Sequence, residues 1–209
     1  MKKLFLFRAR PDGVNQMDTF LETNTISIGW TTVPSMEGKD KDEVRICLEN
    51  IYPDVSNSSV GQVNHFVNNM KIGDLCLIPR PDSNDVYVAE ISKEYYYDDK
   101  DANLCHKIGV EFLNKDKPYK RSEFSLELSK ALRAPMTIAD VSDKLEALEM
   151  FMNNKEIDNN LVVNVEEELK KLLPKAIENI KVNLESDDPE KRMDASLEVL
   201  KLLQELGNK

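Results

Sequence analysis

The segment Ile26-Ser27-Ile28-Gly29-Trp30 constrains the fold more than any other stretch of this chain. Its two isoleucines alternate with a polar residue, which is typical of a strand with one buried face. Gly29 then lets the backbone turn, or be approached closely, just before the chain's only tryptophan. An indole at a strand end is a candidate stacking platform, and simple filling of the core beside the strand is the alternative. The pattern leaves both interpretations of Trp30 open.

The composition indicates a globular protein of a reducing compartment. With 41% hydrophobic and 32% charged residues, the sequence has no apolar run of the roughly 18 residues that a membrane-spanning helix needs. The apolar start of the chain is interrupted by Arg8 and Arg10 before any signal-peptide pattern is complete, so we expect a first strand there. Three cysteines without a CxxC pair predict neither a disulfide framework nor a cysteine zinc site. We therefore expect a cytoplasmic protein that does not associate with membranes.

The net charge of −10 limits the ways in which this chain could bind nucleic acid. Such a charge argues against a protein that coats nucleic acid through bulk electrostatics. Any affinity must therefore come from a focused site. The two histidines, His65 and His106, are far apart in the sequence, and no metal or other cofactor is predicted.

Hydrophobic periodicity predicts an α+β fold, with strands that suit a small β-barrel and helices that flank it. The expected strands are residues 4–8, 26–30, 75–78, 86–97 and 104–113. Three helices are expected from their apolar positions: one through Val44, Leu48 and Ile51; one capped by Ser58 or Ser59 that ends near Gly73; and one over 137–152.

The C-terminal part is expected to be a separate helical module. Residues 153–160 include four asparagines and are read as a linker that ends a domain of residues 1–152. Beyond it, residues 161–209 have the pattern of a helical hairpin, whose second helix is capped by Asp188 with Pro189 at the first helical position. Its expected apolar stripes are Val165, Leu169, Leu172, Leu173, Ile177, Ile180 and Leu184 on one helix, and Met193, Leu197, Leu200 and Leu203 on the other. Such a hairpin cannot bury both stripes by itself, so we expect it to pack on the barrel or on a second copy.

No enzyme motif is present in the sequence. The GxSxG, P-loop, GxGxxG and HExxH patterns are all missing. Asp82, Glu90 and Lys93 approach a metal-dependent nuclease motif, but the last spacing is Glu-x-x-Lys and not acid-x-Lys. The sequence thus predicts a protein that is not an enzyme.

A second group of aromatic residues ends the fourth expected strand. Tyr95 and Tyr97 share one face of a strand and Tyr96 takes the other, with His106 opening the next strand. Ordinary sheet packing explains such a group. Together with Trp30, these rings also supply the flat surfaces and hydroxyls that recognition of an extruded base requires.

Several of these segments, in this order, resemble the PUA-like superfamily, and more narrowly the EVE/YTH-like readers attached to modification-dependent restriction systems. The resemblance covers roughly residues 4–142. It is carried by Phe20-Leu21, by Ile26-Ser27-Ile28-Gly29-Trp30, by Gly61-Gln62-Val63-Asn64-His65-Phe66, by residues 70–79 and 86–97, by His106 with Val110-Glu111-Phe112-Leu113, and by residues 132–141.

The resemblance implies a small barrel with a pocket that accepts a flipped, often methylated, base. Trp30 would be the stacking wall. The other candidates for the pocket are Asn64, His65, Tyr95, Tyr96, Tyr97 and His106. Four arginines could hold phosphates or be plain surface charges: Arg8, Arg80, Arg121 and Arg133.

The chain departs from this family in two ways. Ile108 stands where relatives carry a basic residue two places after the histidine, and a helical hairpin follows where relatives often carry a nuclease or motor domain. We therefore expect a non-catalytic reader of nucleic acid, DNA with a modified base being favoured, in a restriction or phage-defence system whose partner nuclease or motor protein does the cutting. The alternative is a protein interaction scaffold in which residues 161–209 mediate homo-oligomerisation or partner recruitment.

Overall fold

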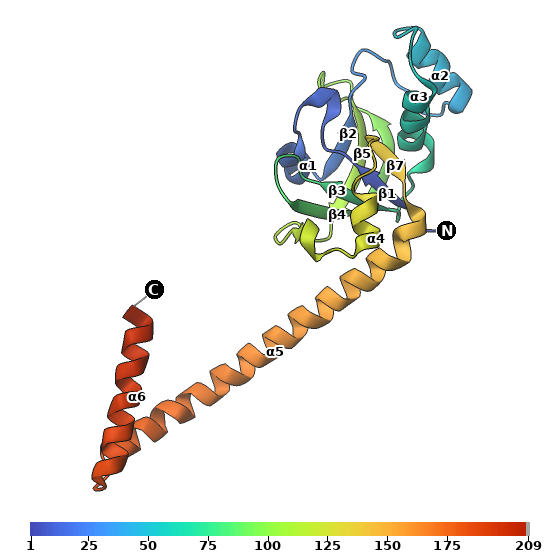
Figure 1. Cartoon of the computed structure of the whole chain (residues 1–209). Coiled ribbons are helices and arrows are strands. Elements are labelled where there is room, and N and C mark those ends of the chain that lie inside the picture. Colours follow the sequence, from blue (N-terminus) through green and yellow to red (C-terminus); the bar gives the residue numbers. More distant parts are fainter. Residues whose placement is uncertain (208–209) are drawn as a thin grey trace. The chain divides into compact units, whose positions relative to one another are not determined.

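The fold is that of a computed structural model (Figure 1). It describes the backbone of residues 1–207, and the side chains of these residues except 156, 158–166, 202, 203 and 205–207. The backbone separates into two compact units, Met1–Phe151 and Met152–Lys209. The proposed linker boundary lies close to this division, but independent folding of the two parts stays a prediction.

The first unit is built on a mixed sheet of seven strands with the order β2-β5-β4-β3-β1-β7, and β6 pairs with β4. β1 runs parallel to β3, and the other pairs are antiparallel. The strands are β1 (Leu4–Phe7), β2 (Thr25–Ile28), β3 (Leu75–Pro79), β4 (Asp85–Tyr97), β5 (His106–Phe112), β6 (Tyr119–Lys120) and β7 (Ile138–Asp140). β2 and β7 do not pair among the described residues, so the sheet is open where a closed barrel was expected.

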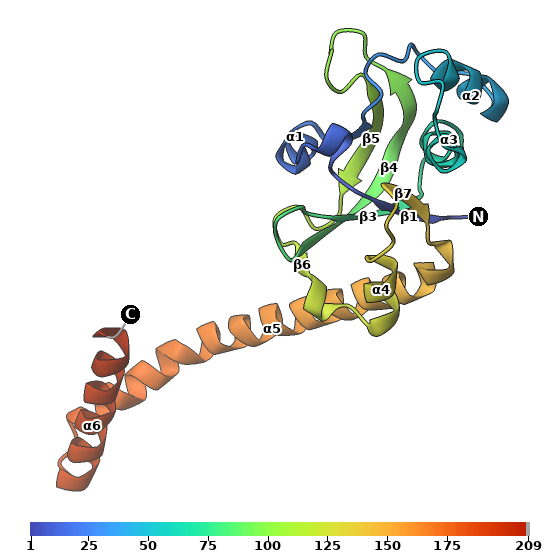
Figure 2. The ribbon, with the colours of Figure 1, turned by 45° about the horizontal axis from the view of Figure 1, so that its top comes forward.

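Helices α1 to α4 complete this unit, and they are α1 (Met17–Thr23), α2 (Lys41–Glu49), α3 (Asn57–Asn64) and α4 (Leu126–Ala131). In Figure 2 the long strands β4 and β5 run side by side, with α1 on the β5 side and α3 on the β4 side. Helices α1, α2 and α3 contribute Phe20, Leu48 and Val63 to one core with the strands. Within this core, Phe7 of β1 contacts both Phe20 and Phe66.

The second expected helix differs from the structure at both ends. Its cap is Ser56, whose hydroxyl accepts the Ser59 N–H at 3.0 Å, and not Ser58 or Ser59. The α-helix ends at Asn64, and His65–Asn69 continue as a π-helix. Hydrophobic spacing is almost the same for both kinds of turn, so the pattern could not distinguish them.

The expected helix over 137–152 is wrong in its first part. Ile138–Asp140 form strand β7, which pairs antiparallel with β1 through Leu6 and Ala139. The free edge of β1 offers backbone partners to this segment, and tertiary pairing of this kind overrides a local helix signal. Helix α5 begins only at Leu145 and runs to Leu184.

The linker expected at residues 153–160 is wrong as secondary structure. These residues are helical and lie inside α5, which also continues through Pro174. Asparagine costs less than about 0.7 kcal/mol at a helix position, so good helix formers on both sides can carry the helix through.

The second unit contains the hairpin that the sequence predicts. Residues 185–188 join α5 to α6 (Pro189–Gly207), and the Asp188 carboxylate accepts the Glu190 N–H at 3.0 Å. Many stripe residues are exposed: Leu169, Leu172, Leu173, Ile177, Met193, Leu197 and Leu200. The side chains of Val165 and Leu203 lie outside the described residues. Within the described part of the chain, no helix is long and apolar enough to cross a membrane.

Gln62 fastens β7 to α3, and its replacement tests this connection. Its Oε1 accepts the N–H groups of Thr137 and Ile138 at 2.8 and 3.1 Å. We expect Gln62→Ala to lower the free energy of unfolding by roughly 1–2 kcal/mol, because two backbone donors lose their acceptor. Gln62→Glu keeps the acceptor oxygens and should lose much less. Urea denaturation compares the two variants, and equal losses would contradict this role.

Candidate functional site

A cavity of about 200 Å³ lies at the end of β2. It forms where this strand end, the turn Pro11–Gly13, α3 and the start of β7 meet. We call it the Trp30 pocket, and its lining residues are Arg10, Pro11, Asp12, Ile28, Gly29, Trp30, Ser59, Gln62, Val63, Thr137 and Ile138. The aliphatic side chains among these, Ile28, Val63 and Ile138, are buried and form an apolar part of the pocket wall.

Trp30 adopts a backbone conformation that a bulky side chain rarely takes. Its φ is +71°, in the left-handed region that costs an L-residue roughly 1–2 kcal/mol. Hydrogen bonds to its carbonyl offset this cost, because the oxygen accepts the Val33 N–H at 2.8 Å and His106 Nε2–H at 3.2 Å. The surrounding structure therefore holds the indole where an unconstrained chain would not place it.

His106 is the centre of the network that holds the turn of residues 30–33, which we call the Trp30 loop. Its Nε2 lies 3.2 Å from the Trp30 carbonyl and 3.1 Å from the Val33 carbonyl, so this nitrogen carries the proton. Burial lowers the pKa of His106, and the imidazole is neutral. Its Nδ1 is then an acceptor, to which the Tyr95 hydroxyl donates a hydrogen bond of 2.8 Å, while the Tyr95 oxygen accepts the Met36 N–H at 3.1 Å.

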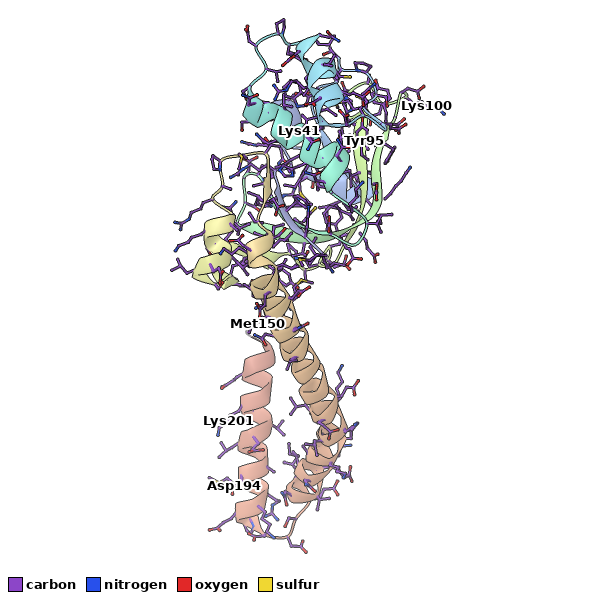
Figure 3. The ribbon with its side chains drawn as sticks, turned by 90° about the vertical axis from the view of Figure 1, so that its right-hand side faces the viewer. Lys41, Tyr95, Lys100, Met150, Asp194 and Lys201 are labelled. Carbon is purple, nitrogen blue, oxygen red and sulfur yellow. The ribbon has the colours of Figure 1, made fainter. Side chains whose placement is uncertain are left out.

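The sheet register explains why these residues meet. His106 opens β5, which lies between β2 and β4, and it pairs with Ile28 on one side and Tyr97 on the other. Tyr95 and Tyr97 both contact the His106 ring, so they share one face of β4, and Tyr95 also contacts Phe66. Figure 3 labels Tyr95 close to α3. Burial, the main cause, raises the pKa of Tyr95 to about 12, so its hydroxyl stays protonated. The strand pairing thus places the neutral His106 imidazole against the Trp30 loop, with the Tyr95 phenol hydrogen-bonded to it.

Tyr52 completes an aromatic corner with Trp30. The two rings meet edge to face, with centroids 5.0 Å apart and planes at 83°. The Tyr52 hydroxyl shares a hydrogen bond of 2.7 Å with Thr32 Oγ1, which fixes the phenol. Trp30 and Tyr52 also line a second, more open hollow beside the Trp30 pocket. Trp30 is half-buried against the core and lines the pocket as well, so each interpretation of this residue describes part of its position.

Asp12 and Arg10 give the Trp30 pocket its charge. The Asp12 backbone has a φ of +50°, and the carboxylate lies directly over Gly29, where an added Cβ would be 2.1 Å from Oδ1. Asp12 is exposed to solvent, and among the described residues its carboxylate has no hydrogen bond or ion pair. Arg10 donates to Asp82 at 3.0 Å. The pocket lining therefore includes one cation that is paired, Arg10, and one carboxylate, Asp12, that can accept hydrogen bonds from a ligand.

Other predicted site residues lie away from the Trp30 pocket. The Asn64 side chain accepts from Asn68 at 2.9 Å, and the His65 ring contacts Phe5 and Asn69. Neither lines the pocket.

The three tyrosines and His106 do not line the pocket either. Tyr95 and His106 support the Trp30 loop from below. The Tyr97 ring meets His106 edge to face, and Tyr96 lies on the other face under the Lys93 ammonium. Of the predicted aromatic and polar pocket residues, the structure therefore brings Trp30, Tyr95, Tyr97 and His106 together, with only Trp30 facing the cavity.

The predicted arginines are not gathered at the pocket. Arg8 donates to the carbonyls of Ala134 and Met136, and Arg80 binds both Asp18 oxygens at 2.7 and 3.0 Å. The Asp18 hydrogen bond raises the pKa of Arg80 further. Arg121 lines a separate hollow with the Pro81–Asn84 turn, and its Nε is buried without a partner among the described residues. Arg133 is exposed.

Sequence reasoning missed most of the pocket wall. Arg10, Asp12, Ser59 and Thr137 come from turns and helix ends that carry no recognisable motif. The same holds for Tyr52, which lines the second hollow. The pairing of Gly29 with the turn Pro11–Gly13 is a tertiary contact, and the only local signal was the glycine before the tryptophan. In the described part of the chain, no group of three or more His, Cys, Asp or Glu side chains could hold a metal ion.

The His106 network predicts how stability depends on pH. The unfolded chain protonates this histidine near its ordinary pKa of 6.5, whereas the folded chain does so only at lower pH. The unfolded state then binds more protons below pH 6.5, so folding stability should be complete above this value and fall as the pH drops through the window beneath it.

A His65→Gln variant isolates this effect, because it leaves His106 as the single histidine. Nuclear magnetic resonance titration of its ring proton should give a pKa below 6.5, and urea unfolding should weaken between pH 7 and pH 5. A ring pKa at or above 6.5 would contradict the neutral, buried imidazole.

One of three comparisons with known proteins, a family model, assigns this chain to a family. No curated protein matches this chain. A crystal structure of protein Atu2648 from Agrobacterium tumefaciens is similar, with 16% sequence identity over 71% of this chain and 92% of that chain, and a TM-score of 0.35. A family model described as a domain of unknown function (DUF8426) matches residues 10–142, from Arg10 through Ile138 of the Trp30 pocket and beyond. Because this match spans more than half of the sequence, the chain belongs to that family.

Proposed function

We propose that the unit Met1–Phe151 binds nucleic acid by taking one extruded base into the Trp30 pocket. The observation that carries this proposal is the fixed aromatic corner of Trp30 and Tyr52 beside a cavity of about 200 Å³. Pockets for drug-sized ligands span roughly 300–1,000 Å³, so this cavity suits a smaller group such as a single base. A base that is stacked in a duplex cannot enter a concave site, and extrusion is therefore part of the proposal.

Two properties of the pocket support a base as its ligand. The indole offers a large flat face, and stacking on an aromatic ring contributes roughly 1–3 kcal/mol per base. The apolar wall of Ile28, Val63 and Ile138 suits a methyl group on the base, whose burial adds about 0.8 kcal/mol. This wall supports the finer proposal that the base is methylated. The proposed role is binding without catalysis.

The wider setting is also proposed. The resemblance to PUA-like, EVE/YTH-like readers supports DNA as the nucleic acid and a place in a restriction or defence system. In that setting, a partner nuclease or motor protein would perform the cutting. The small number of cations at the pocket fits a reader whose affinity depends on the inserted base more than on the phosphates.

Binding of labelled oligonucleotides at low salt tests this function. Fluorescein-labelled single strands and duplexes with cytosine, 5-methylcytosine, adenine or N6-methyladenine at one position are titrated with the protein. We expect binding that depends on the modified base and that Trp30→Ala weakens roughly 5- to 150-fold, because one stacking surface is lost. Trp30→Phe should keep a large part of the affinity.

Tyr96→Ala is the matched control, since this ring lies on the other face of β4 and should leave affinity unchanged. Circular dichroism confirms that each variant is folded. Absence of binding to every oligonucleotide would sink the proposal.

The exposed stripes of the second unit favour a second candidate function, which is self-association. Leu173 and Leu200 are 58% and 56% exposed, and they belong to larger apolar stripes on α5 and α6. Large exposed apolar patches mark interaction sites, and a second copy offers the same stripes to a symmetric pair. The protein would then act as a scaffold through residues 161–209.

Sedimentation velocity distinguishes this scaffold from a monomeric reader. We expect wild-type protein to sediment as a dimer or larger species, and the double variant Leu173→Gln/Leu200→Gln to sediment as a monomer. Val182→Gln removes an equally exposed side chain that lies outside the expected stripe, and it should leave association intact. A monomeric wild-type chain at all concentrations would exclude this function.

A further inference from the structure

The Asp12 carboxylate is a pocket feature that the stacking role of Trp30 does not explain. Its carboxylate lies over the buried Gly29 and lines the Trp30 pocket. Its backbone φ of +50° is in a region that few residues adopt, although aspartate and asparagine tolerate it better than others. Trp30, the residue that follows Gly29, also has a positive φ. Two unusual backbone conformations therefore converge on one small cavity.

The carboxylate is chemically free to bind a ligand. Asp12 is exposed to solvent, and among the described residues neither carboxylate oxygen accepts a hydrogen bond or forms an ion pair. Arg10, which lines the same pocket, directs its guanidinium to Asp82 instead. An ionised carboxylate only accepts hydrogen bonds, and its bonds to N–H donors are stronger than those between neutral groups.

We propose that Asp12 selects bases that carry an exocyclic amino group, a specificity that rests on the proposed function. Adenine, cytosine and guanine each present amino N–H donors, and a carboxylate can accept them. Thymine and uracil flank their ring N–H with two carbonyl oxygens, which the carboxylate repels. The methylated bases 5-methylcytosine and N6-methyladenine keep at least one amino N–H, so this specificity is compatible with recognition of a methylated base.

Gly29 is the positioning residue for this carboxylate. A Cβ at this site would lie 2.1 Å from Asp12 Oδ1 and 2.6 Å from Cγ, so the carboxylate would have to move. Because the obstacle is the end of a flexible side chain, Gly29→Ala should push the carboxylate aside while the fold is kept. This variant moves the acceptor without removing its charge.

The test compares bases that differ only in the amino group. Fluorescein-labelled duplexes carry one unpaired nucleotide. Three pairs of bases are compared, the first member of each with the amino group and the second without it: adenine with purine, guanine with hypoxanthine, and cytosine with 2-pyrimidinone. We expect wild-type protein to bind at least one amino-bearing base about tenfold or more tightly than its partner, as a hydrogen bond to a charged group predicts. Asp12→Asn, which has the same shape and tolerates the same backbone, should reduce this ratio toward one, and Gly29→Ala should do the same.

Asp54→Asn is the matched control for charge. Asp54 lines the second hollow and not the Trp30 pocket, so its replacement changes the local charge equally but should leave the amino preference unchanged. The role of Asp12 would be overturned if the wild type bound both members of every pair with equal affinity. If Trp30→Ala still lost binding in that case, the proposed function would stand. A preference that persists in Asp12→Asn would overturn the role of Asp12 as well. No binding of any duplex would overturn the proposed function itself.

Discussion

The hydrogen bonds from His106 Nε2 to the carbonyls of Trp30 and Val33 are the interaction on which the candidate site depends. They require a neutral imidazole with its proton on that nitrogen, and burial ensures the neutral form by lowering the pKa. They also offset the unfavourable left-handed backbone of Trp30. His106 therefore shapes the pocket indirectly. It fixes the backbone of the Trp30 loop by hydrogen bonds and does not itself line the cavity.

A focused site reconciles the charge of the chain with the function that we propose for it. The net charge is −10. Two of the arginines that were candidates for phosphate binding instead make contacts within the fold. Arg8 binds backbone carbonyls, and Arg80 is neutralised by Asp18. What the Trp30 pocket offers instead is a flat ring, an apolar wall and one unpaired carboxylate. Such a site favours selectivity for a particular group over strong general attraction to phosphates.

Much of the fold was predictable, and the errors have a common cause. Strands at Leu4–Phe7, Leu75–Pro79 and Asp85–Tyr97 follow from alternation or continuous apolar runs, because their side-chain period is imposed by the core. The segment Ile138–Asp140 carries a helix-start pattern and is a strand, since the edge of β1 supplies hydrogen bonds that the local sequence does not encode. Residues 153–160 are helical for a related reason, because their neighbours extend a helix through them.

At the candidate site, the sequence by itself determined that Trp30 follows a strand and a glycine, and that Tyr95 and Tyr97 share a face of β4 opposite Tyr96. These features follow from period and residue type, which act over a few neighbouring residues. Only the tertiary structure decided that His106 supports the Trp30 loop, that Tyr52 meets the indole, and that Asp12 lies over Gly29. These contacts join residues from different elements, and their distances depend on strand register and loop path, which no local pattern records.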